Sequence, residues 1–202
     1  MSEQFRTCEE ILAQMPEAIL AIRRTAFRSL ASGVALSIDE AAAIAGIDIG
    51  AARKATNLVA SVGMAEIQDS KIIGMDGLTS RETQHRLMLG EIARWTWCAY
   101  DIVGIAAALD ADALGKTSCG ACGKEIEIVV RQGRPEASEA VGWLPGADCS
   151  NVMAEFCPSA LLFCSREHLN EWRSTLEGSS GEALGLDALA ERGRIGWHDL
   201  VA

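Results

Sequence analysis

The change of hydrophobic spacing at residue 63 constrains the fold of this chain more than any other feature of its sequence. Before this position apolar side chains recur at helical spacing, and after it the spacing becomes that of short strands. Pro16 divides the first helical segment or marks its first turn. We therefore predict helices over residues 9–30, 38–45 and 48–62, followed by strands over 65–68 and 71–75.

Turn and cap residues support these boundaries. Ser37 and Glu40 have the spacing of a capping box, which opens the short second helix. Asp48 is a suitable N-cap for the third helix, and Gly63 suits the position that follows a helix C-terminus. Helix, short helix, helix and hairpin, in that order, are typical of a winged helix-turn-helix.

DNA binding is the usual function of such a fold, but the charge of this chain does not favour it. The net charge is −10, and the helix in the recognition position carries only Arg53 and Lys54 as cations. The hairpin adds only Lys71. Because affinity for nucleic acid rests mainly on neutralising phosphates, we expect a structural or dimerising use of this region, with DNA binding as the open alternative.

The turn at Met75-Asp76-Gly77 is a candidate domain junction. We expect an α+β protein, with a winged-helix-like N-terminal domain over residues 1–77 and a small mixed β-sheet domain with helices over residues 78–202. In the second domain we predict strands over 84–89, 125–131, 140–144 and 160–164, and helices over 91–109, from Ser165 onward, and over 187–201.

Composition points to a reduced, water-soluble setting. The chain is 202 residues long, 49% hydrophobic and 23% charged, which suits a globular protein with a real core. It has no run of 18 apolar residues and no signal peptide pattern. Its seven cysteines are an odd number, so we expect a cytoplasmic protein whose thiols stay reduced for metal binding or catalysis.

Cys98 and Asp101 are the first candidate pair for chemistry. Three residues apart on a predicted helix, they would share one face. A buried carboxylate is costly unless it is paired, so Asp101 indicates a polar pocket, for which Trp95 and Trp97 are candidate walls. Cys157 is a third candidate, although taken alone either cysteine is more simply a small core residue.

Cys119 and Cys122 form a C-x-x-C motif with intervening glycine, which is typical of a metal knuckle. A complete structural site needs further ligands, and Cys149 or Cys157 are the candidates. The alternative is a free or disulfide-capable thiol pair in a turn. The three histidines have no metal-ligand spacing to one another, and we assign them no role.

Several segments together resemble the alkylmercury (organomercurial) lyase family. The segments that carry the resemblance are Gly77-Leu78-Thr79-Ser80-Arg81-Glu82-Thr83, Trp97-Cys98-Ala99-Tyr100-Asp101, Cys119 and Phe156-Cys157. The resemblance implies an α+β fold of the organomercurial-lyase type. It also implies that Cys98, Asp101 and Cys157 form the catalytic set and hold mercury.

The implied reaction is protonolysis of a carbon–mercury bond, as part of mercury detoxification, with no required cofactor. Thiolates select soft metals, so Cys98 and Cys157 would hold Hg(II) as bound product while Asp101 carries the proton. The implied partners are an organomercurial substrate and soluble thiols or a mercuric reductase that accepts Hg(II). The alternative is a non-enzymatic protein of the same fold that binds or senses copper, zinc or mercury through its cysteines.

Overall fold

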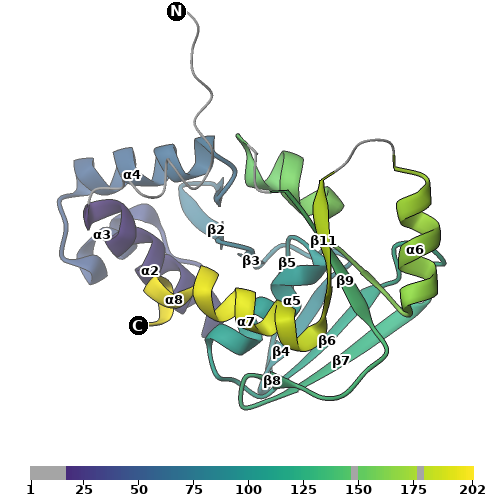
Figure 1. Ribbon diagram of the computed structural model, residues 1–202. Helices are drawn as coiled ribbons and strands as arrows, with labels where there is room; N and C mark the ends of the chain where they lie inside the picture. The colour runs from purple at the N-terminus through teal and green to yellow at the C-terminus, as the bar shows by residue number, and fades with distance from the viewer. Residues whose placement is uncertain (1–16, 147–149, 177–179) are drawn as a thin grey trace, which may run out of the picture.

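The computed structural model describes residues 17–146, 150–176 and 180–202. The N-terminal helices lie at one end of the molecule, and two antiparallel sheets extend toward the other (Figure 1). The helical end consists of α2 (Glu17–Ala31), α3 (Ile38–Ala45) and α4 (Ile49–Ser61). The α2 helix begins directly after Pro16, and the part of the first predicted helix before it lies outside the described residues.

The predicted caps of the helical region are confirmed. The backbone N–H of Glu40 donates to the Ser37 hydroxyl and the Ser37 N–H donates to the Glu40 carboxylate, which completes the capping box. Asp48 accepts from the N–H of Ala51 at the start of α4. Strands β1 (Ala65–Gln68) and β2 (Lys71–Met75) pair antiparallel with the predicted bounds. Assignment of this region to the winged-helix class stays a prediction.

The hairpin opens a sheet that continues far into the second half of the chain. Its strand order is β1-β2-β3-β5-β4-β6-β7-β8, with every neighbouring pair antiparallel. The added strands are β3 (Leu78–Thr79), β4 (Arg86–Leu89), β5 (Ile92–Thr96), β6 (Ala113–Ser118), β7 (Glu125–Arg131) and β8 (Arg134–Pro135). This sheet crosses the predicted junction at residue 77, and the division into two domains there stays a prediction.

A second, three-stranded sheet has the order β10-β9-β11, with β9 (Val141–Pro145) between β10 (Leu161–Phe163) and β11 (Gly181–Gly185). The α5 helix (Ala99–Ala108) is buried along its whole length, as expected of a helix that is apolar on every side. The α7 helix (Leu186–Gly196) crosses α5 closely enough that a Cβ added at Gly193 would lie 2.2 Å from the Cα of Gly104.

Two further helices lie in the C-terminal part of the chain, one before α7 and one after it. The α6 helix (Arg166–Ser174) starts at Ser165, as predicted, with the Ser165 hydroxyl accepting from the N–H of His168. After α7, Trp197 interrupts the predicted last helix, and the short α8 (His198–Val201) follows. Within the described ranges, no helix is long and apolar enough to cross a bilayer.

The predicted helix over residues 91–109 is wrong in its first half. Ile92–Thr96 is strand β5, which pairs with β4 across a turn at Gly90, where φ is +57°. Glycine adopts this conformation at little cost, and the Ile, Trp and Thr side chains that follow favour a strand. The helix α5 begins only at Ala99. Strands β3, β6, β8 and β11 were also not predicted.

Candidate active site

The structure brings Cys98, Asp101 and Cys157 together. Their two sulfur atoms and a carboxylate oxygen all lie within 4.8 Å of one another, and all three residues are buried. Cys98 joins β5 to α5, Asp101 lies in the first turn of α5, and Cys157 begins the short helical turn η2 (Cys157–Ser159). Two thiols and one carboxyl group therefore meet, although the second thiol lies 56 positions after the carboxylate in the sequence (157 minus 101).

The N-terminus of α5 orients the first two groups. Cys98 is the N-cap, with an extended backbone (φ −139°, ψ 170°), and not a residue inside the helix as predicted. Asp101 is the third helical residue, and its Oδ2 accepts the backbone N–H of Cys98 at 3.0 Å. This capping bond satisfies an N–H that the helix leaves free, and it holds the carboxylate beside the thiol.

A tight turn at Asp76 and Gly77 covers the Asp101 carboxylate. Gly77 has φ +93°, and an added Cβ would lie 2.7 Å from the Cγ of Asp101, so glycine is required there on two counts. The Asp76 carboxylate is buried and accepts two bonds from Arg23, at 3.0 and 2.7 Å. The indole N–H of Trp197 donates to the Asp76 carbonyl at 2.7 Å. Sequence reasoning treated this turn only as a domain junction.

Burial sets the protonation of the cluster. Burial raises the pKa of Asp101 to about 7, against hydrogen bonds from Cys98 and Trp97 that lower it, and the Asp76 charge raises it further. Burial, a hydrogen bond with Cys157 and the nearby Asp101 charge raise the pKa of Cys98 well above its usual value. The free protein thus has a neutral Cys98 thiol beside a carboxyl group that gains and loses a proton near neutral pH.

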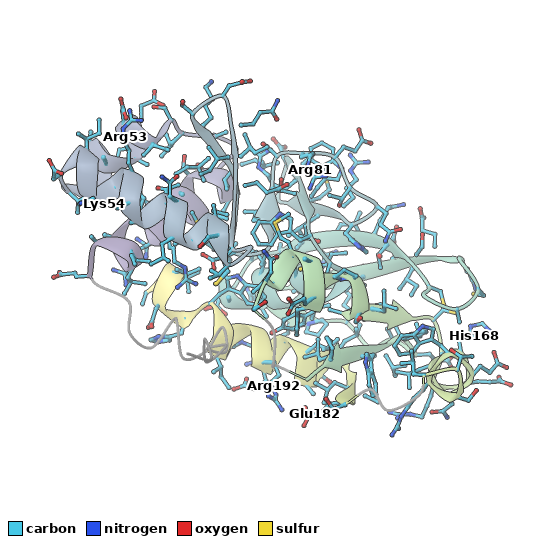
Figure 2. The ribbon with its side chains drawn as sticks, turned by 90° about the horizontal axis from the view of Figure 1, so that it is seen from above. Arg53, Lys54, Arg81, His168, Glu182 and Arg192 are labelled. Carbon is cyan, nitrogen blue, oxygen red and sulfur yellow. The ribbon has the colours of Figure 1, made fainter. Side chains whose placement is uncertain are left out.

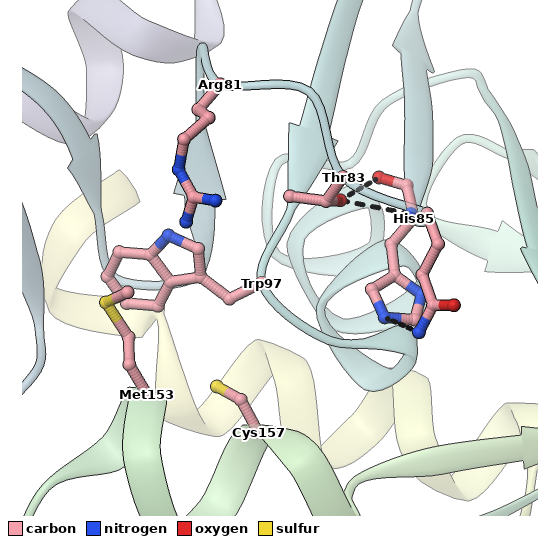
Figure 3. A pocket seen from close by; sticks show the side chains of 7 residues that line it. Arg81, Thr83, His85, Trp97, Met153 and Cys157 are labelled. Carbon is pink, nitrogen blue, oxygen red and sulfur yellow. Dashed lines mark hydrogen bonds between the residues drawn. The ribbon is translucent and has the colours of Figure 1, made fainter.

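Cys157 also faces a pocket of about 240 Å³ that opens beside the cluster (Figure 3). The pocket is lined by Arg81, Thr83, Gln84, His85, Trp97, Met153 and Cys157. Figure 3 shows the Trp97 indole between Arg81 above and Met153 below, with Thr83 and His85 across from it. The indole N–H of Trp97 donates to Glu66 at 2.7 Å, which fixes this wall.

The structure separates the two tryptophans that we predicted as pocket walls. Trp97 lines the pocket, whereas Trp95 lies in β5 opposite Arg86 and Thr79 and is not among the described lining residues. The strand ends at Thr96, so the alternation that would put residues 95 and 97 on one face does not continue.

His85 is a pocket residue that the sequence did not single out. Its side chain is buried, and its Nδ1 lies 2.7 Å from the Thr117 hydroxyl. Burial lowers the pKa of His85 to about 4, so the ring is neutral at physiological pH. No spacing pattern in the sequence would have identified His85, because its contact with Thr117 depends on strand β4 lying next to β6.

A second cluster contains Cys119, Cys122, Cys164 and His168, whose ligand atoms all lie within 4.8 Å of one another. The predicted C-x-x-C pair is therefore joined by Cys164 and His168. The suggestion that Cys157 completes it is wrong, because Cys157 belongs to the Cys98 cluster, and Cys149 lies outside the described residues. The signal that sequence reasoning missed is the C-x-x-x-H spacing of Cys164 and His168.

A buried pair of thiols with an adjacent carboxyl group, on an α+β fold, is suited to binding a soft metal. Comparison with protein families agrees: the family described as MerB, alkylmercury lyase, matches residues 78–194. The chain belongs to the alkylmercury lyase family. The predicted family and the α+β fold are thus confirmed.

Among solved structures, the chain is similar to one titled "Crystal structure of the mercury-bound form of MerB2". The two chains are 25% identical, the match covers 96% of each, and the TM-score is 0.87. The comparison with curated proteins gives no significant match. The similarity extends over nearly the whole chain, including the helical N-terminal part.

Proposed function

We propose that this protein is an organomercurial lyase that cleaves carbon–mercury bonds by protonolysis, with Cys98, Asp101 and Cys157 as its catalytic residues. The observation that carries the proposal is the buried cluster of two thiols and one carboxyl group within 4.8 Å. Thiolate–metal bonds of ~2.3 Å, as zinc has, allow two sulfur atoms on one metal to be at most ~4.6 Å apart, which this cluster can satisfy with little movement.

The residue types suit each step of the reaction. Hg(II) is soft and prefers thiolates, so one cysteine displaces the thiolate that accompanies the organomercurial in solution, and the cysteine proton leaves with that carrier thiol. The second cysteine then transfers its proton to the Asp101 carboxylate and binds mercury as a thiolate. Two sulfur ligands raise the electron density on the carbon–mercury bond.

Asp101 completes the cycle by giving its proton to the carbon atom as the carbon–mercury bond breaks. The electron pair of that bond forms the new carbon–hydrogen bond, and Hg(II) remains on Cys98 and Cys157. Two thiol protons are consumed, one in the hydrocarbon and one in the carrier thiol, so the protons balance. A carboxyl group with a pKa of about 7 suits this role, because it accepts and donates a proton with similar ease near neutral pH.

The surroundings fit a small, largely apolar substrate delivered by a thiol. The pocket beside Cys157 has an aromatic wall at Trp97 and a thioether at Met153, which suit an alkyl or aryl group. We further propose a cytoplasmic role in mercury detoxification, where reduced thiols or a mercuric reductase remove Hg(II). We also propose that the N-terminal domain, residues 1–77, supports the catalytic domain, residues 78–202, and does not bind DNA. Arg53 of α4 is paired with Asp39, so this helix offers little free positive charge to phosphates.

The test is to incubate the protein with phenylmercury and excess thiol and to measure benzene in the headspace and free Hg(II). We expect both products in equal amounts over many turnovers. The Cys157→Ala variant should release no benzene above the uncatalysed rate, because the second thiolate is missing, whereas Cys8→Ala should turn over normally. Stoichiometric binding of phenylmercury without benzene release by the wild-type protein would instead favour the organometal-binding or sensing alternative.

A further inference from the structure

The second cluster consists of four side chains with metal-ligating atoms that the proposed reaction does not use. Cys119 follows β6, Cys122 lies in the loop before β7, Cys164 follows β10, and His168 lies in the first turn of α6. Figure 2 places His168 at the end of the molecule opposite Arg53 and Lys54 of α4. The two ligand pairs are 42 residues apart in the sequence (164 minus 122), and the fold brings them together.

The distances match a tetrahedral ion. Zinc with bonds of ~2.3 Å to sulfur and ~2.1 Å to nitrogen holds its ligand atoms roughly 3.5–3.8 Å apart. The Sγ atoms of Cys122 and Cys164 are 3.9 Å apart, and the Cys119 Sγ is 3.8 Å from the His168 Nδ1. The Cys164 Sγ and His168 Nδ1, at 3.0 Å, would separate slightly when a metal binds between them.

The backbone around Cys119 is built to stabilise a thiolate. The N–H of Cys164 donates to the Cys119 Sγ at 3.5 Å, and the backbone N–H groups of Ala121 and Cys122 also donate to it. Gly123 closes the loop with φ +72°, and its N–H donates to the Cys119 carbonyl at 3.0 Å. A loop that wraps N–H groups around a cysteine sulfur is the usual arrangement of a metal knuckle.

Electrostatics support this reading of the loop. Burial raises the pKa of the Cys119 thiol, but the N–H donors and the Cys122 thiol outweigh it and lower that pKa to about 6. Burial and the neighbouring Cys119 and Cys122 raise the pKa of Cys164 to about 11.

The two halves of the cluster are rigidly held. The N–H of Gly120 donates to the Leu162 carbonyl at 2.9 Å, which fastens the knuckle to β10. The α6 helix is anchored by Trp172, whose ring centroid lies 5.1 Å from that of Phe163 and 5.9 Å from that of Trp143. The ligands are thus positioned by packing on both sides, as a structural metal site requires.

We infer that Cys119, Cys122, Cys164 and His168 form a structural zinc site, separate from the mercury-handling cluster. Three thiolates and one imidazole, with C-x-x-C and C-x-x-x-H spacing, are a standard closed donor set for zinc. The ion ties the loop between β6 and β7 to the start of α6. Since β10 connects Cys157 to Cys164, the site also steadies the segment that carries the second catalytic thiol.

The experiment measures bound zinc in the full-length protein, purified in reducing buffer without a chelator. We expect one zinc ion per chain by mass spectrometry of the elements, and an X-ray absorption spectrum that fits three sulfur atoms and one nitrogen. Cys122→Ser and Cys164→Ser should lose at least nine-tenths of the zinc. Cys122 is exposed, so that variant should keep its fold, which far-UV circular dichroism checks.

Three histidine variants and one cysteine variant sharpen the test. His168→Cys should retain zinc and change its ligands to four sulfur atoms, whereas His168→Ala should lose it. The exposed His198, outside the cluster, should tolerate alanine without zinc loss, as should Cys157→Ser. Each result is obtained without substrate, so a failure of the lyase proposal leaves it unaffected.

Three outcomes would overturn the zinc site. One is wild-type protein that contains no zinc and takes none from a chromophoric zinc chelator in competition. Another is full zinc content in the Cys164→Ser variant. The third is a disulfide between Cys122 and Cys164 in metal-free protein isolated under reducing conditions, found by mass measurement of the native chain.

Discussion

The Asp101 carboxyl group has two tasks in the proposed reaction: it takes a thiol proton and it delivers that proton to carbon. A backbone hydrogen bond from the N–H of Cys98 to Oδ2, at 3.0 Å, helps to hold it in position. An amide in the same place keeps the shape and can still face that N–H, but it cannot carry a proton. Replacing Asp101 by asparagine should therefore leave binding of the organomercurial intact while it slows turnover.

We expect Asp101→Asn to bind phenylmercury while its benzene release falls by about 10²–10⁴-fold, the usual loss when a general acid is removed. Mass spectrometry of the intact protein should detect the trapped phenylmercury adduct, and gas chromatography should follow benzene. If the variant turns over at the wild-type rate, Asp101 is not the proton donor.

His85 makes stability depend on pH. Burial lowers its pKa from 6.5 to about 4 in the folded protein, so between these values the unfolded chain binds more protons. The stability that comes from keeping the ring neutral is fully present above pH 6.5 and is lost as the pH falls toward 4. Loss of this contribution at pH 4.5 should be on the order of 2 kcal/mol.

The measurement is the free energy of unfolding by urea at pH 7.5 and at pH 4.5, for the wild type and for His85→Asn. Carboxyl groups shift the stability of both proteins alike, so the difference between the two proteins isolates His85. We expect the wild type to lose more stability on acidification than the variant. Equal losses would show that His85 titrates normally in the folded protein.

At the scale of elements, the turn between β2 and β3 covers the Asp101 carboxylate in the candidate active site. Gly77 combines a left-handed backbone with direct contact to Asp101, so a side chain there strains the turn and displaces the carboxylate. Gly90, between β4 and β5, also has a left-handed backbone, but nothing lies within 4 Å of an added Cβ. The two glycines form a matched pair that separates backbone strain from damage to the site.

We predict that Gly77→Ala lowers stability by about 1–3 kcal/mol and reduces turnover at least tenfold, whereas Gly90→Ala costs about 1 kcal/mol and leaves turnover intact. Thermal unfolding and benzene release measure the two effects. Similar turnover in both variants would mean that the turn does not position Asp101.

At the scale of the whole molecule, a buried ion pair joins the helical N-terminal region to the site. Arg23 of α2 donates to both oxygen atoms of Asp76, and Asp76 adjoins the glycine that covers Asp101. The large sheet also runs from β1 through β8 without interruption. If these contacts dominate, the two predicted domains unfold together.

We expect Arg23→Met to lower the free energy of unfolding by about 3–5 kcal/mol, because Asp76 loses the cation that compensates its buried charge. The double variant Arg23→Met with Asp76→Asn should recover part of this loss. Urea unfolding followed by circular dichroism and by tryptophan fluorescence should show one transition. Two separate transitions would support a domain division near residue 77 that is energetically independent.

Local signals in the sequence determined much of this fold. Ser37, Glu40 and Asp48 marked helix starts, because caps satisfy N–H groups within a few residues of chain. The β1–β2 hairpin and strand β7 followed from short-range alternation. The family and the three residues of the candidate active site were also accessible, since motifs such as Cys98-Ala99-Tyr100-Asp101 are continuous in the chain.

Contacts between distant segments were decided by the tertiary structure alone. Residues 92–96 became a strand because β4 offered a pairing edge, which outweighed the helical pattern of the residues that follow. Asp76 lies buried beside the site because Arg23 of α2, 53 residues earlier, compensates its charge. Cys164 and His168 lie next to Cys119 and Cys122 because β10 packs beside the knuckle loop. The spacing of residues along the chain predicts only contacts within one helix or turn. These groups meet because burial of the hydrophobic core brings their separate elements together.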